Sequence, residues 1–459
     1  MVLLLNPPST RRVSRDYYCG HFAKARYGWP PFDLLVLSGR LPGRDVLVLD
    51  AIAEGLDAGA AMARIDALRP VAVLAVVAAV SWREDVAFLS RVKARCGSAI
   101  AVSGDYPRAC PADALDRHDA IDAVVLDFAD CDLGGLPDGA VAGGLRNVHT
   151  RLDPEPRFEN ARTFRLPGPR HELFDLCRYH LPTVRRHPFT LVTTDFGCRH
   201  GCAWCYHERV PHKLRDLDDL ASELAFVRSL GVPEIVLQDQ SFGSVRPHAI
   251  EACAVLSHGG SPFTWVCEMR PDDADPDLLR AMRRAGCHTV MLGVETASRD
   301  VLARHRKRSG PDDARRAFAL AREAGIRTLA HFLLGLPGED EASLRRTLDL
   351  CMDLEPDIAS FNVAAPAWGT TLRHEVVANG WMIEDGVGIA GDGSRPVWES
   401  PSLPRDTVVR VRDEALRRFY MRPSYVVRQL LSVRSAYQLR TLIAEGLDVL
   451  RSALPVSPR

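Results

Sequence analysis

The chain is organised around the stretch FGCRHGCAWCY, residues 196–206, in which three cysteines fall within eight residues. Loops this tight and an odd number of thiols do not suit a disulfide framework, so the cysteines are expected to be thiolate ligands of one metal centre. A structural zinc ion takes four protein ligands, and His200 or His207 would then be the fourth. Iron–sulfur clusters are also held by cysteine thiolates, usually four. Since the local set stops at three, one iron of a [4Fe–4S] cube would be left open.

The spacing Cys198-x3-Cys202-x2-Cys205, with the aromatic Trp204 before the last cysteine, resembles the signature of the radical S-adenosylmethionine (SAM) superfamily. An apolar, β-branched run at 189–194 leads into it, as a strand would. The resemblance implies a [4Fe–4S] cluster on the three cysteines, with SAM chelated to the open iron. It also implies that an electron from the cluster cleaves SAM to methionine and a 5′-deoxyadenosyl radical.

The length of 459 residues predicts two or three domains. The 58 Lys and Arg against 59 Asp and Glu residues give no global attraction to nucleic acid or to an anionic membrane. The opening MVLLLNPP is too short for a signal peptide, and the longest apolar run, 71–80, is too short to span a bilayer. We therefore expect a cytoplasmic protein without a membrane span, whose twelve cysteines are kept reduced.

Residues 1–145 alternate apolar runs with helical patterns such as 60–68 and 86–93. The runs lack polar alternation, which is typical of parallel strands buried on both faces. They are residues 2–5, 46–49, 71–77, 99–102 and 123–126. This order predicts a doubly wound, Rossmann-like α/β domain, with any ligand at the carboxyl ends of its strands.

Such a domain ahead of the cysteine motif resembles the cobalamin-binding domain of B12-dependent radical SAM enzymes. The segments that carry the likeness are Leu5-Asn6-Pro7-Pro8, Trp29-Pro30-Pro31-Phe32-Asp33-Leu34-Leu35, Val48-Leu49-Asp50-Ala51 and Ser103-Gly104-Asp105. The likeness implies that cobalamin contacts Asn6, Pro7, Ser103 and Gly104. Typical members carry Asp-x-His-x-x-Gly, whose histidine binds cobalt, but Asp116-Arg117-His118 lacks the glycine and His21 lacks the context. Cobalamin would then be held without a protein histidine; the alternative is a vestigial domain that binds no corrin.

The rest of the chain divides into a connector, a catalytic core and a tail. Residues 146–185 are rich in Arg, His and Pro and are expected to be a linker. In 186–400, three helical patterns end at Gly231, Gly286 and Gly325, each followed at once by an apolar strand. With three further apolar runs this predicts six parallel strands, which fits the partial (β/α)6 TIM-type barrel of radical SAM enzymes. Residues 401–459 are expected to form a small helical extension, with helices at 405–419 and 426–454.

Chemistry in such barrels lies at the carboxyl ends of the strands, where several marked residues fall. By resemblance, Arg270 and Glu295 are expected to bind the carboxylate and the ribose of SAM, beside Trp204. Gln238, Asp239 and Gln240 stand where relatives contact the SAM amino group. The alternative for Arg270 and Glu295 is a structural ion pair across the barrel mouth. Cys267 and Cys287 are expected to pack in the core.

Together these features predict a B12-dependent radical SAM methyltransferase that acts on an unactivated carbon through a 5′-deoxyadenosyl radical and methylcobalamin. The alternative is a rearrangement, cyclisation or oxidation by a radical SAM enzyme whose cobalamin-like domain is non-methylating or vestigial. A non-enzymatic, zinc-linked binding protein is a third class. The substrate is left open among small molecules, lipids, tetrapyrroles and peptides, and an electron donor such as flavodoxin or ferredoxin is the expected partner.

Overall fold

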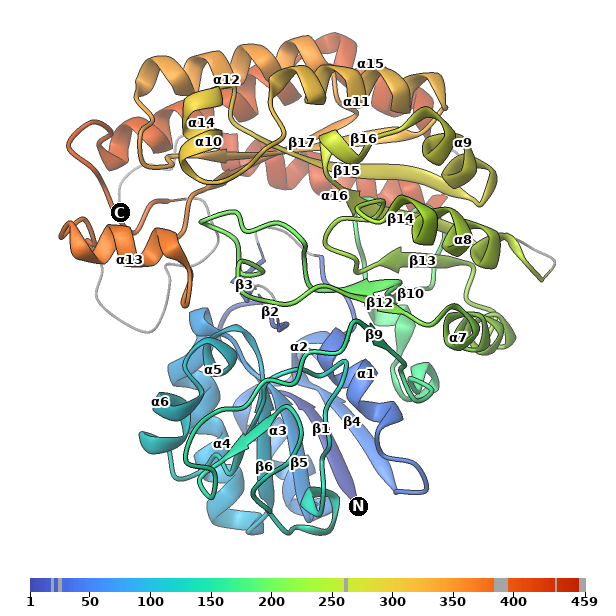
Figure 1. Ribbon diagram of the computed structural model, residues 1–459, viewed down its shortest axis with the longest axis vertical. Coiled ribbons are helices and arrows are strands. Elements are labelled where there is room, and N and C mark those ends of the chain that lie inside the picture. The colour runs from blue at the N-terminus through green and yellow to red at the C-terminus, as the bar shows by residue number, and fades with distance from the viewer. Residues whose placement is uncertain (18–19, 24–26, 260–262, 384–394, 434–435, 454–459) are drawn as a thin grey trace.

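Two parallel sheets, one above the other in Figure 1, form the framework of the molecule. The computed structural model describes residues 1–17, 20–23, 27–259, 263–383, 395–433 and 436–453. The first sheet lies in the lower half, near the N-terminus, and the second in the upper half. The strands of the first sheet run upward, so their carboxyl ends face the second sheet.

The first sheet has the strand order β4-β1-β5-β6-β7-β8, and its first five strands are parallel. The strands are β1 (Val2–Asn6), β4 (Val46–Asp50), β5 (Ala72–Val76), β6 (Ala99–Ser103), β7 (Ala123–Val125) and β8 (Val148–Thr150). Helices α1 (Phe32–Gly39), α3 (Ala58–Leu68) and α4 (Trp82–Cys96) connect them. The predicted doubly wound fold is confirmed. Because the strand order reverses between β1 and β5, the usual ligand crevice of such folds lies at their carboxyl ends.

The two faces of this sheet pack into different cores. On β1, Leu3 and Leu5 belong to one hydrophobic cluster, while Val2 and Leu4 belong to another. Successive side chains of a strand point to opposite faces, so a strand that is apolar throughout is buried on both sides. This is why the uninterrupted apolar runs of the sequence identified the strands.

The segment 146–185, predicted as a linker, also contributes strands. Its β8 pairs antiparallel with β7 at the edge of the first sheet. Its β9 (Thr163–Phe164) pairs with β12 (Lys213–Arg215), which in turn pairs with β11 (Asp195–Phe196). Strands of two or three residues are too short to show a hydrophobic period, so the sequence pattern did not reveal them. The segment therefore ties the two halves together rather than only connecting them.

The second sheet is a partial barrel of six parallel strands in sequence order. They are β10 (Phe189–Val192), β13 (Glu234–Leu237), β14 (Thr264–Met269), β15 (Cys287–Glu295), β16 (Arg327–Leu334) and β17 (Ile358–Val363). Helices α7 (Leu217–Ser229), α8 (Arg246–Ser257), α9 (Pro276–Arg284), α11 (Pro311–Glu323) and α12 (Glu341–Leu354) alternate with them. Gly286, with φ +99°, shows why glycine ends α9: a Cβ there would lie 2.0 Å from the carbonyl oxygen of Phe263.

The C-terminal part is helical, as predicted, but it is divided differently. Helix α14 (Arg405–Tyr420) packs against β17 and α12, and the Tyr420 hydroxyl donates to the Ala359 carbonyl at 2.5 Å. The single helix predicted at 426–454 is wrong, because the structure has two helices there. Helix α15 (Pro423–Ser432) ends before an extended Val433, and α16 (Ala436–Ala453) follows. Serine and β-branched valine are weak helix formers. Residues 434–435 and 454 lie outside the described part of the chain.

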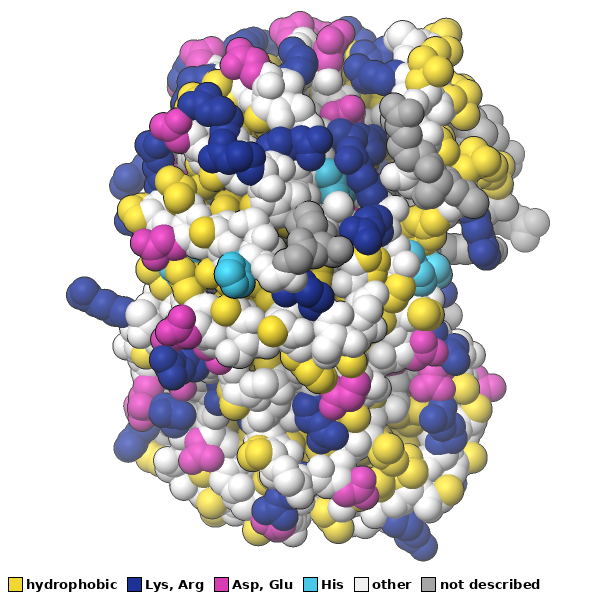
Figure 2. All heavy atoms as spheres, turned by 90° about the vertical axis from the view of Figure 1, so that its right-hand side faces the viewer, with side chains coloured by type: hydrophobic (Ala, Val, Ile, Leu, Met, Phe, Trp, Pro, Cys, Tyr) yellow, Lys and Arg dark blue, Asp and Glu magenta, His cyan; other side chains and the backbone are white. Residues whose placement is uncertain are grey.

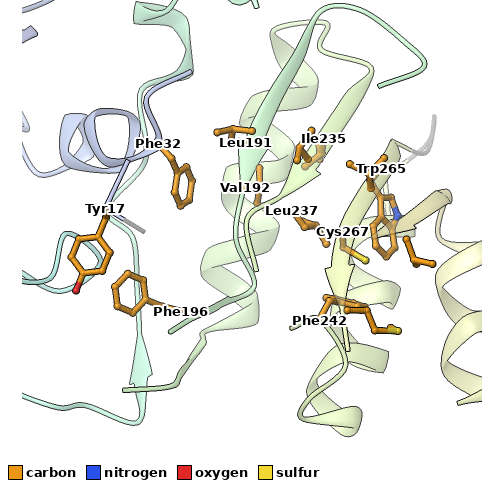
Figure 3. Packing of buried hydrophobic residues seen from close by; sticks show 14 of the residues in the cluster. Tyr17, Phe32, Leu191, Val192, Phe196, Ile235, Leu237, Phe242, Trp265 and Cys267 are labelled. Atoms are coloured by element: carbon orange, nitrogen blue, oxygen red, sulfur yellow. The ribbon is translucent and has the colours of Figure 1, made fainter. Parts of the chain in front are cut away.

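Aromatic side chains join the two halves in one continuous core (Figure 3). The Tyr17 ring lies 5.6 Å from that of Phe196, the first residue of the cysteine stretch, and both rings contact Phe128. Cys267 packs beside Leu237 and Trp265 inside the barrel wall (Figure 3). Cys287 is also fully buried, so both cysteines are core residues, as predicted.

The outer surface carries charges of both signs. On the side seen in Figure 2, Lys and Arg side chains gather over the barrel half, with Asp and Glu side chains among them. Among the helices that the structure describes, none is both long and apolar enough to cross a bilayer.

Candidate functional site at the carboxyl ends of the two sheets

Cys198, Cys202 and Cys205 lie in the loop that follows the first barrel strand, at the carboxyl end of the barrel. Gly197 turns the chain into this loop at φ +77°, and a Cβ there would lie 2.2 Å from the carbonyl oxygen of Pro211. The loop is pinned by backbone bonds from Cys205 to Cys202 and from Ala203 to His305, both at 3.0 Å. The cysteines are thus presented by a fixed backbone.

The surroundings of the three thiols disfavour charge in the absence of a cation. Burial raises the pKa of Cys198 to about 11, and Cys202 adds to it. Burial likewise raises the pKa of Cys205, with contributions from Cys202 and Cys198. Burial also raises the pKa of Cys202, and a bound metal centre is what would stabilise the three thiols as thiolates. The donor set therefore fits an iron–sulfur cluster.

The zinc alternative depends on His200 or His207 as the fourth ligand. Within the described ranges, no group of three or more His, Cys, Asp or Glu side chains converges on a single metal ion. A cube offers each thiolate its own iron, so its ligands need not meet at one point. His207 is buried, and burial holds its pKa well below the usual value. Burial, with Arg270 nearby, lowers the pKa of His200 to about 4.

Asp239 makes contacts that differ from the expected one to SAM. Its Oδ1 accepts from the backbone N–H of Thr194 at 2.6 Å and from the Thr193 hydroxyl at 2.8 Å. Its Oδ2 accepts from the Thr194 hydroxyl, and the side chain is 1% exposed. The carboxylate that ends the second strand therefore holds the segment that leads into the cysteine loop. Gln238 and Gln240, on either side of it, are only half-buried.

Arg270 and Glu295 do not pair with each other. Arg270 binds Asp272 with two nitrogens at 2.9 and 2.8 Å, and its Nη1 lies 3.9 Å from the Sγ of Cys202. Glu295 accepts from Lys307 Nζ at 2.8 Å. Instead of one ion pair across the barrel mouth, there are two separate pairs, Arg270 with Asp272 and Glu295 with Lys307. The Nη1 of Arg270 remains directed at the cysteine loop.

Glu295 has a backbone conformation that is unusual for its residue type. Its φ is +67°, and the register between β15 and β16 shifts between Gly293 and Glu295. Bulges of this kind re-aim a side chain, and left-handed non-glycine residues concentrate at functional sites. Lys307 holds the bulge and the Glu295 side chain together, because its Nζ also donates to the Gly293 carbonyl at 2.8 Å. Sequence reasoning missed Lys307, which stands in an Arg-Lys-Arg run after a helix without any motif.

Trp204 and Glu268 mark two further sides of the barrel mouth. The Trp204 ring meets His305 edge-on at 5.6 Å, and His305 bonds the Pro337 carbonyl at 3.0 Å. Glu268, on β14, is half-buried, and burial together with the Glu295 charge raises its pKa to about 7. The mouth thus holds a carboxyl group that changes charge near neutral pH.

At the carboxyl edge of the first sheet, Asn6 and Pro7 are occupied by the chain's own Arg15. The buried Arg15 Nη1 donates to Asn6 Oδ1 and to the Pro7 carbonyl, both at 2.7 Å. Its Nη2 pairs with Asp85 at 2.6 Å. Asn6 also donates to Asp50 at 2.9 Å. This network lies where the strand order reverses, between β1 and β5. No sequence pattern predicted it.

Ser103 and Gly104 are likewise used within the domain. The Ser103 hydroxyl donates to Asp33 at 2.5 Å. A Cβ on Gly104 would lie 1.9 Å from the Val77 carbonyl oxygen, so glycine is required there by the neighbouring strand end. His118 accepts from the Trp82 indole N–H at 3.3 Å, which occupies the Nε2 that could bind cobalt.

Charged side chains bridge the two carboxyl edges beside the cysteine loop. Lys213 of β12 forms a buried salt bridge with Asp127, which follows β7. Arg108, which follows β6, donates to the backbone carbonyl of Tyr206, next to Cys205, at 3.0 Å. The ligand edge of the first sheet thus contacts the cysteine loop directly.

Comparison with known proteins agrees with this arrangement. Residues 193–351 match the Radical SAM superfamily. An uncharacterized methyltransferase of Pyrococcus horikoshii is 23% identical over 445 residues, which cover 94% of each chain. The methyltransferase TsrM from Kitasatospora setae, solved with cobalamin and a [4Fe–4S] cluster, superposes with a TM-score of 0.66 at 16% identity over 98% of both chains. The cobalamin-dependent enzyme OxsB, solved with aqua-cobalamin and SAM, gives 0.70 at 13% identity over 98% of this chain and 71% of its own.

Residues 193–351, which include the cysteine loop and most of the barrel, are therefore a radical SAM domain, of the kind that uses a [4Fe–4S] cluster and SAM. The two-sheet fold of the chain is similar to that of TsrM and OxsB.

Proposed function

We propose that the chain is a cobalamin-dependent radical SAM methyltransferase that methylates an unactivated carbon. The observation that carries the proposal is the direct contact of the two ligand edges, made by Lys213 with Asp127 and by Arg108 with Tyr206. A methyl carrier on the first sheet would then lie next to the radical-generating centre of the second.

In this proposal Cys198, Cys202 and Cys205 hold the cluster, and Asp239 fixes the chain that enters their loop. The cluster supplies the electron that cleaves SAM. Arg270 Nη1 lies beside Cys202 and is placed to balance thiolate charge and to meet the carboxylate of SAM. Glu295, held by Lys307, offers a carboxylate to the ribose hydroxyls. Gln238, Gln240 and Trp204 would line the remaining sides.

Cobalamin would lie along the carboxyl edge that includes Asn6, Pro7, Ser103 and Gly104, and it would carry the methyl group. The polar groups of this edge suit a large polar ligand, but Arg15 covers Asn6 and Pro7 in the structure described. Binding there would exchange the Arg15 contacts for contacts to the corrin. Because His118 is bonded to Trp82, we expect no protein imidazole on cobalt. Electron paramagnetic resonance of the Co(II) form would then lack nitrogen splitting from the protein.

The substrate class stays open among small molecules, lipids, tetrapyrroles and peptides, but the methyl-carrier half of the reaction can be tested without it. Anaerobic enzyme reconstituted with reduced cobalamin is mixed with SAM labelled in its methyl group. Label that moves to the corrin, with formation of S-adenosylhomocysteine, supports the proposal. If no corrin is retained, or no label moves while 5′-deoxyadenosine is still formed, the alternative of a rearrangement, cyclisation or oxidation takes its place.

A further inference from the structure

The last two helices of the chain, α15 and α16, concentrate exposed apolar surface. They carry seven of the seventeen large hydrophobic side chains that are exposed among the described residues. Four of the seven are on α15, namely Val426, Val427, Leu430 and Leu431, and Leu431 is 73% exposed. Large apolar side chains that gather on one part of a surface mark a protein or membrane interaction site.

Helix α15 is held with its leucines pointing outward. Its buried side chains are Tyr425 and Gln429. The Tyr425 ring packs against the rings of Phe419 and Tyr420, at 5.0 and 5.2 Å, and Gln429 donates to the Asp357 carbonyl at 2.7 Å. A surface helix ordinarily buries its apolar stripe and exposes its polar side. Because α15 does the reverse, its apolar stripe is left for a partner outside the chain.

Helix α16 has the same arrangement. Near its start the Tyr437 ring stacks on His187 at 5.1 Å, which holds the helix against the connector segment. Leu439, Ile443 and Leu447 follow one another at intervals of four residues and are all exposed, so they form a stripe along the helix. Both α15 and α16 contact α14, and α15 lies at the end of the barrel half away from the first sheet (Figure 1).

Arginine accompanies these stripes. Residues 416–444 contain six arginines and no Lys, Asp or Glu, although the whole chain has a formal net charge of −1. The sequence VRQLL at 427–431 recurs as LRTLI at 439–443. The exposed arginines of the two segments, Arg428 and Arg440, stand one turn before Leu431 and Ile443. Neither arginine forms an ion pair with any residue that the structure describes.

We propose that the exposed side chains of α15 and α16 form a docking surface for an anionic lipid bilayer. The apolar stripes enter the boundary between headgroups and acyl chains, and Arg428 and Arg440 meet the lipid phosphates. Helices that lie in a membrane interface combine an apolar stripe with Lys or Arg in this way, and anionic lipid attracts their positive charge. The inference does not use the proposed function.

A second copy of the chain is a poorer fit to the same surface. A two-fold interface brings one patch against itself. Arg428 and Arg440 would then approach their own copies, and residues 416–444 offer no carboxylate to pair with them. Like charges that face each other across an interface oppose association. The phosphates of an anionic bilayer complement both the charge and the apolar stripes.

The experiment measures binding of the full-length protein to vesicles by co-sedimentation, at low and high salt. One vesicle is phosphatidylcholine alone, and the other is an equal mixture of phosphatidylcholine and phosphatidylglycerol. Leu431→Ser/Ile443→Ser removes apolar contacts, and Arg428→Glu/Arg440→Glu reverses the charge. The thermal midpoint of each variant reports folding, and it should stay unchanged because all four side chains are exposed.

Each variant has a matched control elsewhere on the surface. Leu152→Ser/Val377→Ser replaces two apolar side chains that are 69% and 54% exposed, close to the exposed fractions of Leu431 and Ile443. Arg83→Glu/Arg91→Glu reverses two exposed arginines on α4. Sedimentation velocity without vesicles measures self-association of the wild type and of the leucine–isoleucine variant.

We expect the wild type to bind the mixed vesicles about tenfold or more tightly than phosphatidylcholine alone, and both test variants to lose about tenfold or more of that affinity. High salt should weaken binding of the wild type, and both controls should bind as the wild type does. Absence of wild-type binding to the mixed vesicles would overturn the inference, as would equal losses in the controls. A wild-type dimer that Leu431→Ser/Ile443→Ser dissociates would also overturn it, because the surface would then belong to a second copy.

Discussion

The Oδ1 of Asp239 accepts a 2.6 Å hydrogen bond from the backbone N–H of Thr194, and thereby joins the end of the second barrel strand to the chain that enters the cysteine loop. The same carboxylate also accepts hydrogen bonds from the hydroxyl groups of Thr193 and Thr194. A single buried carboxylate thus sets where the cysteine loop begins.

Replacing Asp239 by alanine should weaken cluster retention. The change leaves buried donors of Thr193 and Thr194 unsatisfied, which costs about 1–3 kcal/mol for each such group. The measurement is iron content after anaerobic reconstitution, together with the thermal midpoint. Asp218→Ala, at the exposed start of α7, serves as control. Full iron loading in Asp239→Ala would show that the loop does not depend on this carboxylate.

Arg270→Ala and Glu295→Ala should each weaken SAM binding, because each removes a charge-assisted contact of about 1.5–3 kcal/mol. Lys307→Ala should weaken binding only through Glu295, so the Lys307→Ala/Glu295→Ala double variant should be no worse than Glu295→Ala. Equilibrium binding of SAM to reconstituted enzyme measures all four. Additive losses would mean that Lys307 contacts SAM itself, and unchanged affinity in both single variants would remove Arg270 and Glu295 from the site.

The Lys213–Asp127 salt bridge should stabilise the contact between the two halves of the chain. Both side chains are buried, so Lys213→Met leaves Asp127 as an uncompensated charge and should destabilise the chain by about 3–5 kcal/mol. The double variant Lys213→Met/Asp127→Leu should recover most of this loss. Denaturation of the wild type and of the two variants measures both effects. A double variant as unstable as the single one would mean that the pair itself, not the stranded charge, carries the effect.

Glu268 should give the stability a pH dependence. Burial raises the pKa of Glu268 in the folded chain to about 7 from its ordinary value of 4.5, so near these pH values the folded chain holds a proton that the unfolded chain has released. Its contribution therefore favours folding at low pH and is lost as the pH rises from about 4.5 through 7. Glu268→Gln should flatten this part of the profile of thermal midpoint against pH. Parallel profiles for wild type and variant would contradict the assignment.

The sheets were predictable from the sequence because buried parallel strands are uninterrupted apolar runs, as in residues 72–76, and because glycines such as Gly286 mark the helix ends. The cysteine loop was predictable because its spacing is local. The contacts of Arg15 with Asp85 and of Asp239 with Thr194 join residues 70 and 45 positions apart, and no local pattern encodes them. The same holds for Lys213 and Asp127, 86 positions apart.

The central claim is that three cysteines hold a [4Fe–4S] cluster that cleaves SAM. Its most direct test is iron, sulfide and 5′-deoxyadenosine analysis of anaerobically reconstituted wild type and of the Cys198→Ala/Cys202→Ala/Cys205→Ala variant. The account predicts about four irons and four sulfides per chain and reductive formation of 5′-deoxyadenosine in the wild type, with all three lost in the variant. One zinc ion per chain, with no sulfide and no 5′-deoxyadenosine, would contradict it.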